Sequence, residues 1–286
     1  MTEVRPQARS LHFIQYGAEH VAKSLSIRGG SNEVQWEPII GAVIETDAGW
    51  VVFDTGMSRA AFSSPAIAAA YGAGSPAHAG RSPRLDPLPP DGAEWAWLAG
   101  ADPLEAGLAS VGLEVADLSL AVISHLHVDH SGGIPTLASH GVPIAIQARE
   151  LAFARSGRVA ESAGFHPPDW QHPDTRWIEL DGDGPLAPGV SAISTPGHTP
   201  GHMSLLVELP GSGAWLLAAD AADLGENFLD QVPCGSAAGG TAADEADADR
   251  SLGRLFDVAH EHRARIIPGH DQIVVTAVRH PLGGHR

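Results

Sequence analysis

Cysteine is nearly absent from this sequence, since Cys234 is the only one among 286 residues. A single thiol excludes an intrachain disulfide. No disulfide is needed for a stable core, because a domain of this length buries about three-quarters of the surface that its unfolded chain exposes. Nothing in the sequence makes Cys234 a metal ligand.

Basic side chains are also scarce. The chain has 17 Lys and Arg against 34 Asp and Glu, which gives a net charge of −17, and it contains no basic run. A surface that binds nucleic acid or anionic lipid needs clustered positive charge. We therefore expect neither nucleic acid nor a membrane as a partner.

Long apolar runs are missing as well. No stretch reaches the ~18 residues that cross a bilayer. The first residues, MTEVRPQARSLHFIQYG, lack the apolar core of a signal peptide. These two observations predict a cytoplasmic protein.

What the sequence does contain is a series of short apolar runs typical of β-strands, with helical patterns between them. Helices are expected at residues 94–111, after Gly133, and from 242 to about 262. No linker separates these elements, so they predict one layered α/β domain over residues 1–286. The strands are expected to begin near Leu11, Ile39, Trp50, Leu118, Pro143, Val190, His202, Ala214 and Ala264.

Residues 58–91 differ from the rest, because they are rich in Ala, Gly, Ser and Pro and show no sustained period. A long irregular segment within a compact domain is usually functional or mobile. We expect a loop or lid inserted into the domain at this point.

The motif HLHVDH, residues 125–130, follows directly on the apolar run that begins at Leu118. His125 and His127 are two residues apart and can point to the same side of an extended backbone. Asp129 and His130 come where the chain turns, so they can address a second metal ion. Four specified positions in a six-residue window arise by chance about once in 10⁵ windows, so the motif is specific.

Three further candidate ligands end apolar strands. His198 lies in the turn STPGHTPGH, Asp220 ends AWLLAAD, and His270 lies in IIPGHD. Together with the motif they supply seven ligands for two ions. The alternative is a group of solvated histidines in a chain that has 16 of them. The strand context and the downstream partners both favour the metal site.

The HxHxDH motif, the TPGHTPGH turn, the strand-terminal aspartate and the late Gly-His resemble the metallo-β-lactamase superfamily. The resemblance implies an αββα sandwich of two mixed sheets flanked by helices. It also implies a first metal on His125, His127 and His198, a second metal on Asp129, His130 and His270, and Asp220 as the bridge between them.

Other site features follow from the same resemblance. Asp54, in the DTG turn, is similar to a buried aspartate that orients metal ligands, although a turn-forming aspartate is the alternative. His202 is expected to be structural. Imidazole and carboxylate ligands suit two zinc ions, and iron, cobalt or manganese also bind such ligands. His127 favours hydrolysis over redox chemistry, because flavodiiron-type members usually have a glutamate there.

The segment ADAADLGENFLDQVPCG, from Ala219, resembles the corresponding stretch of N-acyl homoserine lactonases. Glu226, Asn227, Phe228 and Val232-Pro233 stand at the expected offsets from Asp220. The implied reaction is metal-dependent opening of a lactone ring, with N-acyl homoserine lactones, the signals of quorum sensing, as the leading substrate. The candidate catalytic residues are Asp129, Asp220 and Asp223.

Asp223 is the departure from this pattern, because the lactonases have a tyrosine that donates a hydrogen bond to the lactone oxygen. An ionised aspartate only accepts hydrogen bonds. Asp223 can take up a proton, contact a donor on a different lactone, or point away. Val128 and Phe228 are candidates for the walls of the substrate pocket, with core packing as the alternative for both.

Other functions with the same motif stay open. A thioesterase and an organophosphate or other ester hydrolase share the expected fold. A mono-iron dioxygenase is disfavoured by the full ligand set, and a nuclease by the net charge. A binding protein without catalysis is disfavoured by the intact bridging aspartate and late histidine. In each hydrolytic case the partner is a small lactone or ester, and a homodimer is left open.

Overall fold

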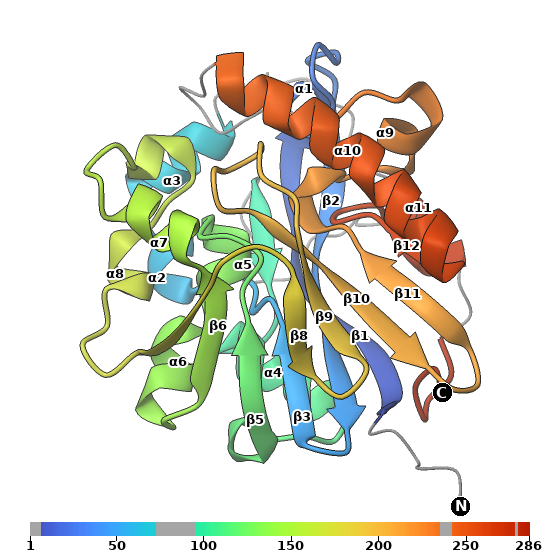
Figure 1. The fold of residues 1–286 in the computed structure, drawn as a ribbon. Helices are drawn as coiled ribbons and strands as arrows, with labels where there is room; N and C mark the ends of the chain where they lie inside the picture. The colour runs from blue at the N-terminus through green and yellow to red at the C-terminus, as the bar shows by residue number, and fades with distance from the viewer. Residues whose placement is uncertain (1–6, 73–94, 235–241, 278–279) are drawn as a thin grey trace, which may run out of the picture.

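The computed structural model describes residues 7–72, 95–234, 242–277 and 280–286, and these form layers in the order helix, sheet, sheet, helix (Figure 1). Both sheets mix parallel and antiparallel pairs. The predicted αββα sandwich is therefore confirmed. No helix in the described part of the chain is both long and apolar enough to cross a bilayer.

The first sheet has seven strands in the order β4-β1-β2-β3-β5-β6-β7. Its β4, β1, β2 and β3 pair antiparallel, and β3, β5, β6 and β7 pair parallel. Their bounds are β1 Ala8–Ala22, β2 Val34–Thr46, β3 Gly49–Phe53, β4 Ala96–Leu98, β5 Leu118–Val122, β6 Pro143–Gln147 and β7 Arg176–Leu180.

The second sheet has five strands in the order β12-β11-β10-β9-β8. Only β11 and β12 pair in parallel; the others pair antiparallel. Their bounds are β8 Gly184–Ala187, β9 Val190–Ser194, β10 Met203–Leu209, β11 Gly213–Leu217 and β12 Arg265–Ile267.

The apolar runs fill three cores because successive residues of a strand point to opposite faces. Val52 packs against helices, whereas its neighbours Val51 and Phe53 lie between the two sheets. In the second sheet, Leu206 and Leu216 face α10 (Ala242–His262), which crosses the outer face of this sheet in Figure 1. Strands buried on both faces read as nearly continuous apolar runs, which is why they could be found in the sequence.

The other helices are short and connect or cover the sheets. They are α1 Lys23–Ser26, α2 Arg59–Phe62, α3 Pro65–Gly72, α4 Pro103–Ser110, α5 Val128–Ser131, α6 Ile134–Ser139, α7 Ala148–Ala154, α8 Pro167–Trp170, α9 Gly225–Asp230 and α11 Gln272–Ala277. Single 3-10 turns lie at Val115–Asp117, Glu161–Ala163 and Ala219–Ala221.

Two predicted elements need correction. Residues 94–111 do not form one helix, because Ala96–Leu98 is a strand that pairs with β1, and α4 begins only after Asp102, which caps it. Residues 58–72 are not an irregular loop, because Ser58 caps α2, and α3 buries Ile67 in the core. The rest of the predicted lid, residues 73–91, lies outside the described residues.

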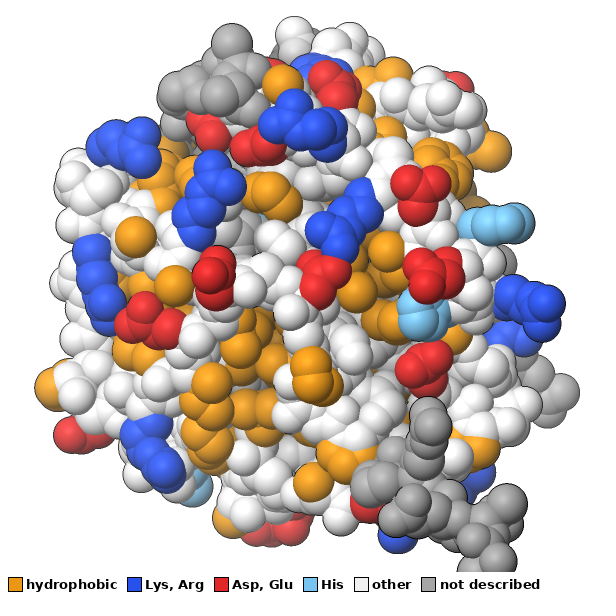
Figure 2. All heavy atoms as spheres, viewed as in Figure 1, with side chains coloured by type: hydrophobic (Ala, Val, Ile, Leu, Met, Phe, Trp, Pro, Cys, Tyr) orange, Lys and Arg blue, Asp and Glu red, His pale blue; other side chains and the backbone are white. Residues whose placement is uncertain are grey.

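The face of the molecule that carries β8 and α10 shows basic and acidic side chains next to one another (Figure 2). Arg254 of α10 forms an ion pair with Asp183, and Arg149 pairs with Asp247. Two arginines on this face are therefore paired with acidic neighbours. The chain termini also come together, since Leu11 of β1 forms a bridge with His285.

Candidate metal centre

Several strands of both sheets end at one edge of the sandwich, and polar side chains follow their last residues. Asp54 follows β3, and Ser124 and the histidine motif follow β5. The turn between β9 and β10 carries His198, while β11 and β12 run on into Asp220 and His270. All seven predicted ligands lie in two groups that share Asp220, and they are His125, His127, Asp129, His130, His198, Asp220 and His270.

The first group contains three imidazoles. Nδ1 of His127 lies 3.0 Å from Nε2 of His125 and 2.9 Å from Nε2 of His198. Oδ2 of Asp220 lies 3.2 Å from Nε2 of His198 and 3.6 Å from Nε2 of His125. The ligand atoms of a tetrahedral zinc ion lie about 3.3 Å apart, as follows from Zn–N bonds of about 2.0–2.1 Å. The spacing of these four atoms therefore suits a metal ion.

The second group combines two imidazoles with two carboxylates. Nε2 of His130 lies 3.0 Å from Oδ2 of Asp129 and 3.1 Å from Oδ1 of Asp220. Nε2 of His270 lies 3.1 Å from Oδ1 of Asp220 and 3.4 Å from Oδ2 of Asp129. The two oxygens of Asp220 thus face different groups, so this carboxylate would offer one oxygen to each of two ions.

The tautomer of His130 tests whether these groups fit a metal. Its Nδ1 lies 2.9 Å from Oδ2 of Asp54 and carries the proton of that hydrogen bond. In the neutral form of the ring that binds a metal, the lone pair of Nε2 faces the carboxylates of Asp129 and Asp220, and Nε2 has no hydrogen-bond partner among the described residues. A cation between them removes this repulsion, so the residues of the second group fit a metal ion.

Electrostatics keep His125, His127 and Asp220 in their metal-binding protonation states. Despite burial, nearby carboxylates raise the pKa of His130 and His270 well above the usual value, so these two rings release a proton when a metal binds. Burial lowers the pKa of His127 to about 3 and that of His125 well below its usual value. Burial alone would raise the pKa of Asp220, but the charges of His130 and His270 outweigh it and hold that pKa well below its usual value. Neutral imidazoles and ionised carboxylates are the forms that act as ligands.

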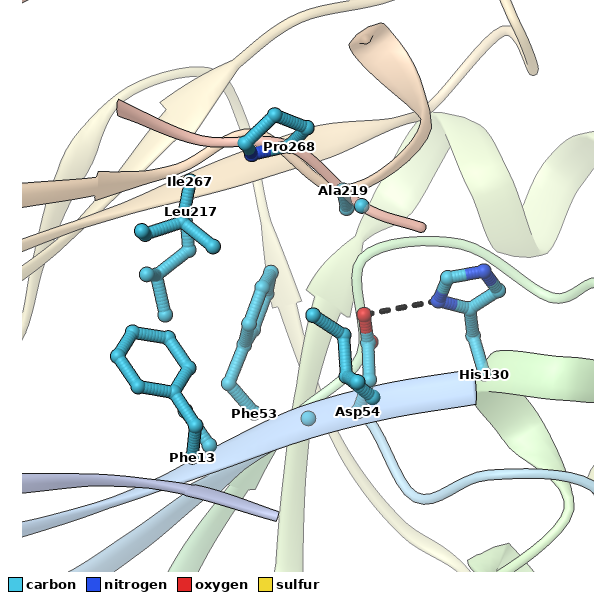
Figure 3. A pocket seen from close by; sticks show the side chains of 12 residues that line it. Phe13, Phe53, Asp54, His130, Leu217, Ala219, Ile267 and Pro268 are labelled. Carbon is cyan, nitrogen blue, oxygen red and sulfur yellow. Dashed lines mark hydrogen bonds and ion pairs between the residues drawn. The ribbon is translucent and has the colours of Figure 1, made fainter. Parts of the chain in front are cut away.

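Asp54 orients one ligand of the second group, His130, through a hydrogen bond. Its Oδ1 accepts a hydrogen bond from the backbone N–H of Ser124 at 2.7 Å, while Oδ2 bonds His130. Asp54 has φ +57°, which is strained for a residue other than glycine. Figure 3 shows the Asp54–His130 contact at one end of a mainly apolar cavity between the sheets, with Phe13 and Phe53 among its walls. Asp54 therefore sets the orientation of the His130 ring.

His202 supports Asp220 rather than joining either group. Its Nε2 accepts a hydrogen bond from the backbone N–H of Asp220 at 3.1 Å, and its Nδ1 lies 2.9 Å from Oγ1 of Thr195. Because both ring nitrogens are in use and the ring is fully buried, the structural role expected for His202 agrees with its contacts.

Glu150 is a residue that the sequence analysis missed. This fully buried side chain accepts hydrogen bonds from the backbone N–H of Leu126 at 3.1 Å and of Gly201 at 3.0 Å. Leu126 lies between the first two histidines of the motif, and Gly201 lies in the turn that carries His198. Glu150 therefore ties together the two segments that form the first group.

Tyr71 was also missed, because it lies in the segment expected to be irregular. It is near the end of α3, and its hydroxyl donates a hydrogen bond to Oδ1 of Asp129 at 3.3 Å. Oδ2 of the same carboxylate faces His130 and His270. A phenolic donor thus stands beside the second group.

Asp223 is buried close to the centre. Its backbone carbonyl accepts from the N–H of His270, and its N–H donates to Sγ of Cys234 at 3.1 Å. Oδ1 has no hydrogen-bond partner among the described residues. Burial and the charge of Asp220 raise the pKa of Asp223 well above its usual value, which favours the protonated form.

Two predicted pocket residues pack in or against the hydrophobic cores. Val128 is fully buried in the cluster between the first sheet and its helices. Phe228 packs against α10, where its ring meets that of Phe256 at 5.6 Å. These contacts agree with the core-packing alternative for both side chains, and their assignment to a substrate pocket stays a prediction.

The family model described as the metallo-beta-lactamase superfamily matches residues 42–270 of this chain. The chain belongs to the metallo-β-lactamase superfamily. The matched range starts in β2 and ends at His270, so it includes all seven residues of the two ligand groups.

Within this superfamily, curated relatives include an N-acyl homoserine lactonase of a Bacillus species, 35% identical over 164 residues. That match covers 57% of this chain and 60% of the relative. The N-acyl homoserine lactonase AttM of Azorhizobium caulinodans is 33% identical over 178 residues, with 58% and 63% covered. The matches thus span about three-fifths of the relatives' length.

Solved structures give matches of nearly full length. A quorum-quenching N-acyl homoserine lactone hydrolase superposes with a TM-score of 0.76 at 26% identity, covering 96% of this chain and 98% of the other. Another, with the product N-hexanoyl-L-homoserine bound at its catalytic metal centre, gives a TM-score of 0.74 at 27% identity, covering 96% and 97%.

Proposed function

We propose that this protein is a dinuclear metal-dependent hydrolase that opens lactone rings, with N-acyl homoserine lactones as its substrates. The observation that carries the proposal is the paired ligand cluster, in which the two oxygens of Asp220 face separate groups. The similarity to lactonases over nearly the whole chain supports the choice of substrate.

Zinc is the metal we propose, because three neutral imidazoles and a carboxylate are typical zinc ligands. His125, His127 and His198 would hold the first ion, and Asp129, His130 and His270 the second, with Asp220 between them. When bound, the two ions would supply a water nucleophile at neutral pH and polarise the lactone carbonyl.

The residues of the chain then position the reactants. Asp54, His202 and Glu150 hold ligands or ligand-bearing segments through their hydrogen bonds. Tyr71 is the donor that we assign to the lactone oxygen, in the role played in lactonases by the tyrosine that Asp223 replaces. A protonated Asp223 would not repel the charge that develops on that oxygen, and it could itself donate.

The test is hydrolysis of a panel of compounds by protein of counted metal content, with acid release followed at constant pH. The panel contains short- and long-chain N-acyl homoserine lactones, an aliphatic lactone and an aromatic lactone, with a thioester and a phosphotriester as controls. Chelator-sensitive opening of the acyl homoserine lactones supports the proposal. Turnover of the thioester or the phosphotriester alone would replace it with a thioesterase or an organophosphate hydrolase.

A further inference from the structure

Two buried glutamates lie beside the metal centre and take no part in the proposed reaction. Glu19 of β1 and Glu37 of β2 are directly opposite each other in the antiparallel register. Their side chains therefore lie on the same face, where like charges directly opposite one another are destabilising. An oxygen of each carboxylate and a ring nitrogen of His270 all lie within 4.8 Å of one another.

The two glutamate carboxylates differ in the number of hydrogen bonds that they accept. Glu37 accepts hydrogen bonds from Oγ of Ser26 at 2.7 and 2.8 Å and from Nε2 of Gln35 at 2.7 Å. Glu19 is only 6% exposed, yet its Oε2 has no hydrogen-bond partner among the described residues. Within the described ranges, neither carboxylate forms an ion pair with Lys or Arg.

When His270 serves as a neutral metal ligand, the two glutamates have no positively charged side chain beside them among the described residues. A buried carboxylate is destabilising unless a cation or good hydrogen bonds compensate it. His270 does not supply the missing contact, because its Nδ1 faces the carbonyl of Pro38 at 3.0 Å and its Nε2 faces Asp220. Oε2 of Glu19 can therefore still accept a hydrogen bond or bind a cation, and it lies next to a second carboxylate, that of Glu37.

We propose that Glu19 and Glu37 form a cation subsite next to the second metal group, distinct from the seven ligands of the dinuclear centre. The cation is either a hard divalent ion, for which carboxylate oxygens are the preferred ligands, or the ammonium group of a substrate. The second alternative rests on the proposed function, and it assigns to this protein lactones that carry a free amine.

To test whether the cation is a metal ion, Mn²⁺ is added to protein that already holds two zinc ions. Both metals are counted after the free ions are removed. The wild type is expected to bind one further Mn²⁺ and to melt at a higher temperature with it. Glu19→Gln is expected to lose both effects. Glu45→Gln is the matched control, because it removes the same charge from β2 at a position eight residues from Glu37.

To test whether the cation is the ammonium group of a substrate, equilibrium binding is measured for two ligands. L-homoserine has a free ammonium group, and N-acetyl-L-homoserine has none. The wild type is expected to prefer homoserine by about ten-fold or more, as one well-placed ion pair gives. Glu19→Gln should bring the two affinities together, and Glu45→Gln should not. Glu19 is the better position to vary, because no hydrogen bond to its Oε2 is lost.

Either positive result supports the subsite and identifies its source. If wild-type protein takes up no third ion and binds homoserine no more tightly than the acetylated form, the two glutamates hold only a shared proton and the inference is wrong. Both measurements are made at equilibrium. A protein that shows the cation effects but opens no lactone would therefore lose the proposed function and keep the subsite.

Discussion

Asp220 is the residue on which the metal centre depends most directly. Its Oδ1 faces His130 and His270, and its Oδ2 faces His198. Its backbone N–H donates a hydrogen bond to His202, so both the backbone and the carboxylate of Asp220 are held in position. A single side chain therefore sets the spacing of the two ligand groups.

Asp220→Ala should leave a folded protein that no longer retains two ions. Substitutions of residues that merely support a ligand cost 10–100-fold in metal affinity, so loss of the bridge should cost more than about 100-fold. Metal content after dialysis and the circular dichroism spectrum measure the two effects. His127→Ala should behave in the same way, and Asp230→Ala, at an exposed position, is the control. A fully loaded and active Asp220→Ala protein would contradict the bridging role.

Tyr71→Phe tests the donor assigned to the lactone oxygen. Removal of one donor of this kind typically lowers kcat by about 10²-fold or more. The variant should keep both metals and show little change in KM, because the aromatic ring remains in place. Equal loss of metal and activity would instead make Tyr71 a support for Asp129.

The ligands and the supporting residue Asp54 could be predicted from sequence, whereas Glu150, Tyr71 and the two buried glutamates could not. His125, His127, Asp129 and His130 form one motif, and the other ligands follow apolar runs. Glu19 and Glu37 are near His270 only because of the register between β1 and β2 and the path of the chain after β12. Such contacts depend on tertiary structure, and no local pattern marks them.

At the scale of elements, the turn between β9 and β10 is fitted against α7 without space for a side chain. A Cβ added at Gly201 would lie 2.1 Å from the backbone nitrogen of Glu150 and 2.5 Å from its Cα. Since both atoms belong to the backbone, the turn can accept a side chain only by moving away from α7. That movement would also displace His198.

Gly201→Ala should therefore weaken metal binding as well as stability. We expect a loss of roughly 1–3 kcal/mol in the free energy of unfolding, as overpacking usually causes, and at least about ten-fold weaker binding of the first ion. Denaturant unfolding and metal titration measure these effects. The control is Gly253→Ala in α10, where nothing lies near the added Cβ and the better helix former should stabilise the protein. Equal behaviour of the two variants would show that the turn is free to move.

Strands could be predicted from the sequence where they are buried, because buried strands consist almost entirely of apolar residues. β5, β6 and β11 are buried strands and were found as apolar runs. β7, with the sequence RWIEL, is half exposed and was missed. β4 is only three residues long, and its strand geometry comes from pairing with β1, so the helical spacing of its apolar residues was misleading.

At the scale of the whole molecule, stability should depend on pH through Asp169. Burial raises the pKa of this side chain to about 7, although it accepts a hydrogen bond from Ser58. The folded protein then binds one more proton than the unfolded chain between about pH 4 and pH 7, so this contribution to stability falls as the pH rises through that range. The decrease should be at most about 4 kcal/mol, given about 1.36 kcal/mol per pKa unit.

Asp169→Asn should remove this decrease. Unfolding of the metal-loaded wild type and of the variant, measured from pH 4 to pH 8, gives a difference curve in which the effects of the metal ligands cancel. The free energy of unfolding of the wild type should fall relative to that of the variant as the pH rises to about 7. Above that pH the two curves should be parallel. Parallel curves over the whole range would show that Asp169 ionises as it does in water.

The central claim is that two metal ions, held by these seven residues, open a lactone ring. Its most direct test is to titrate metal-free protein with zinc and to measure the hydrolysis of N-hexanoyl homoserine lactone after each addition. The account predicts that activity rises to its maximum at two equivalents of zinc and is abolished by a chelator. Full activity at one equivalent, or activity that a chelator leaves unchanged, would contradict it.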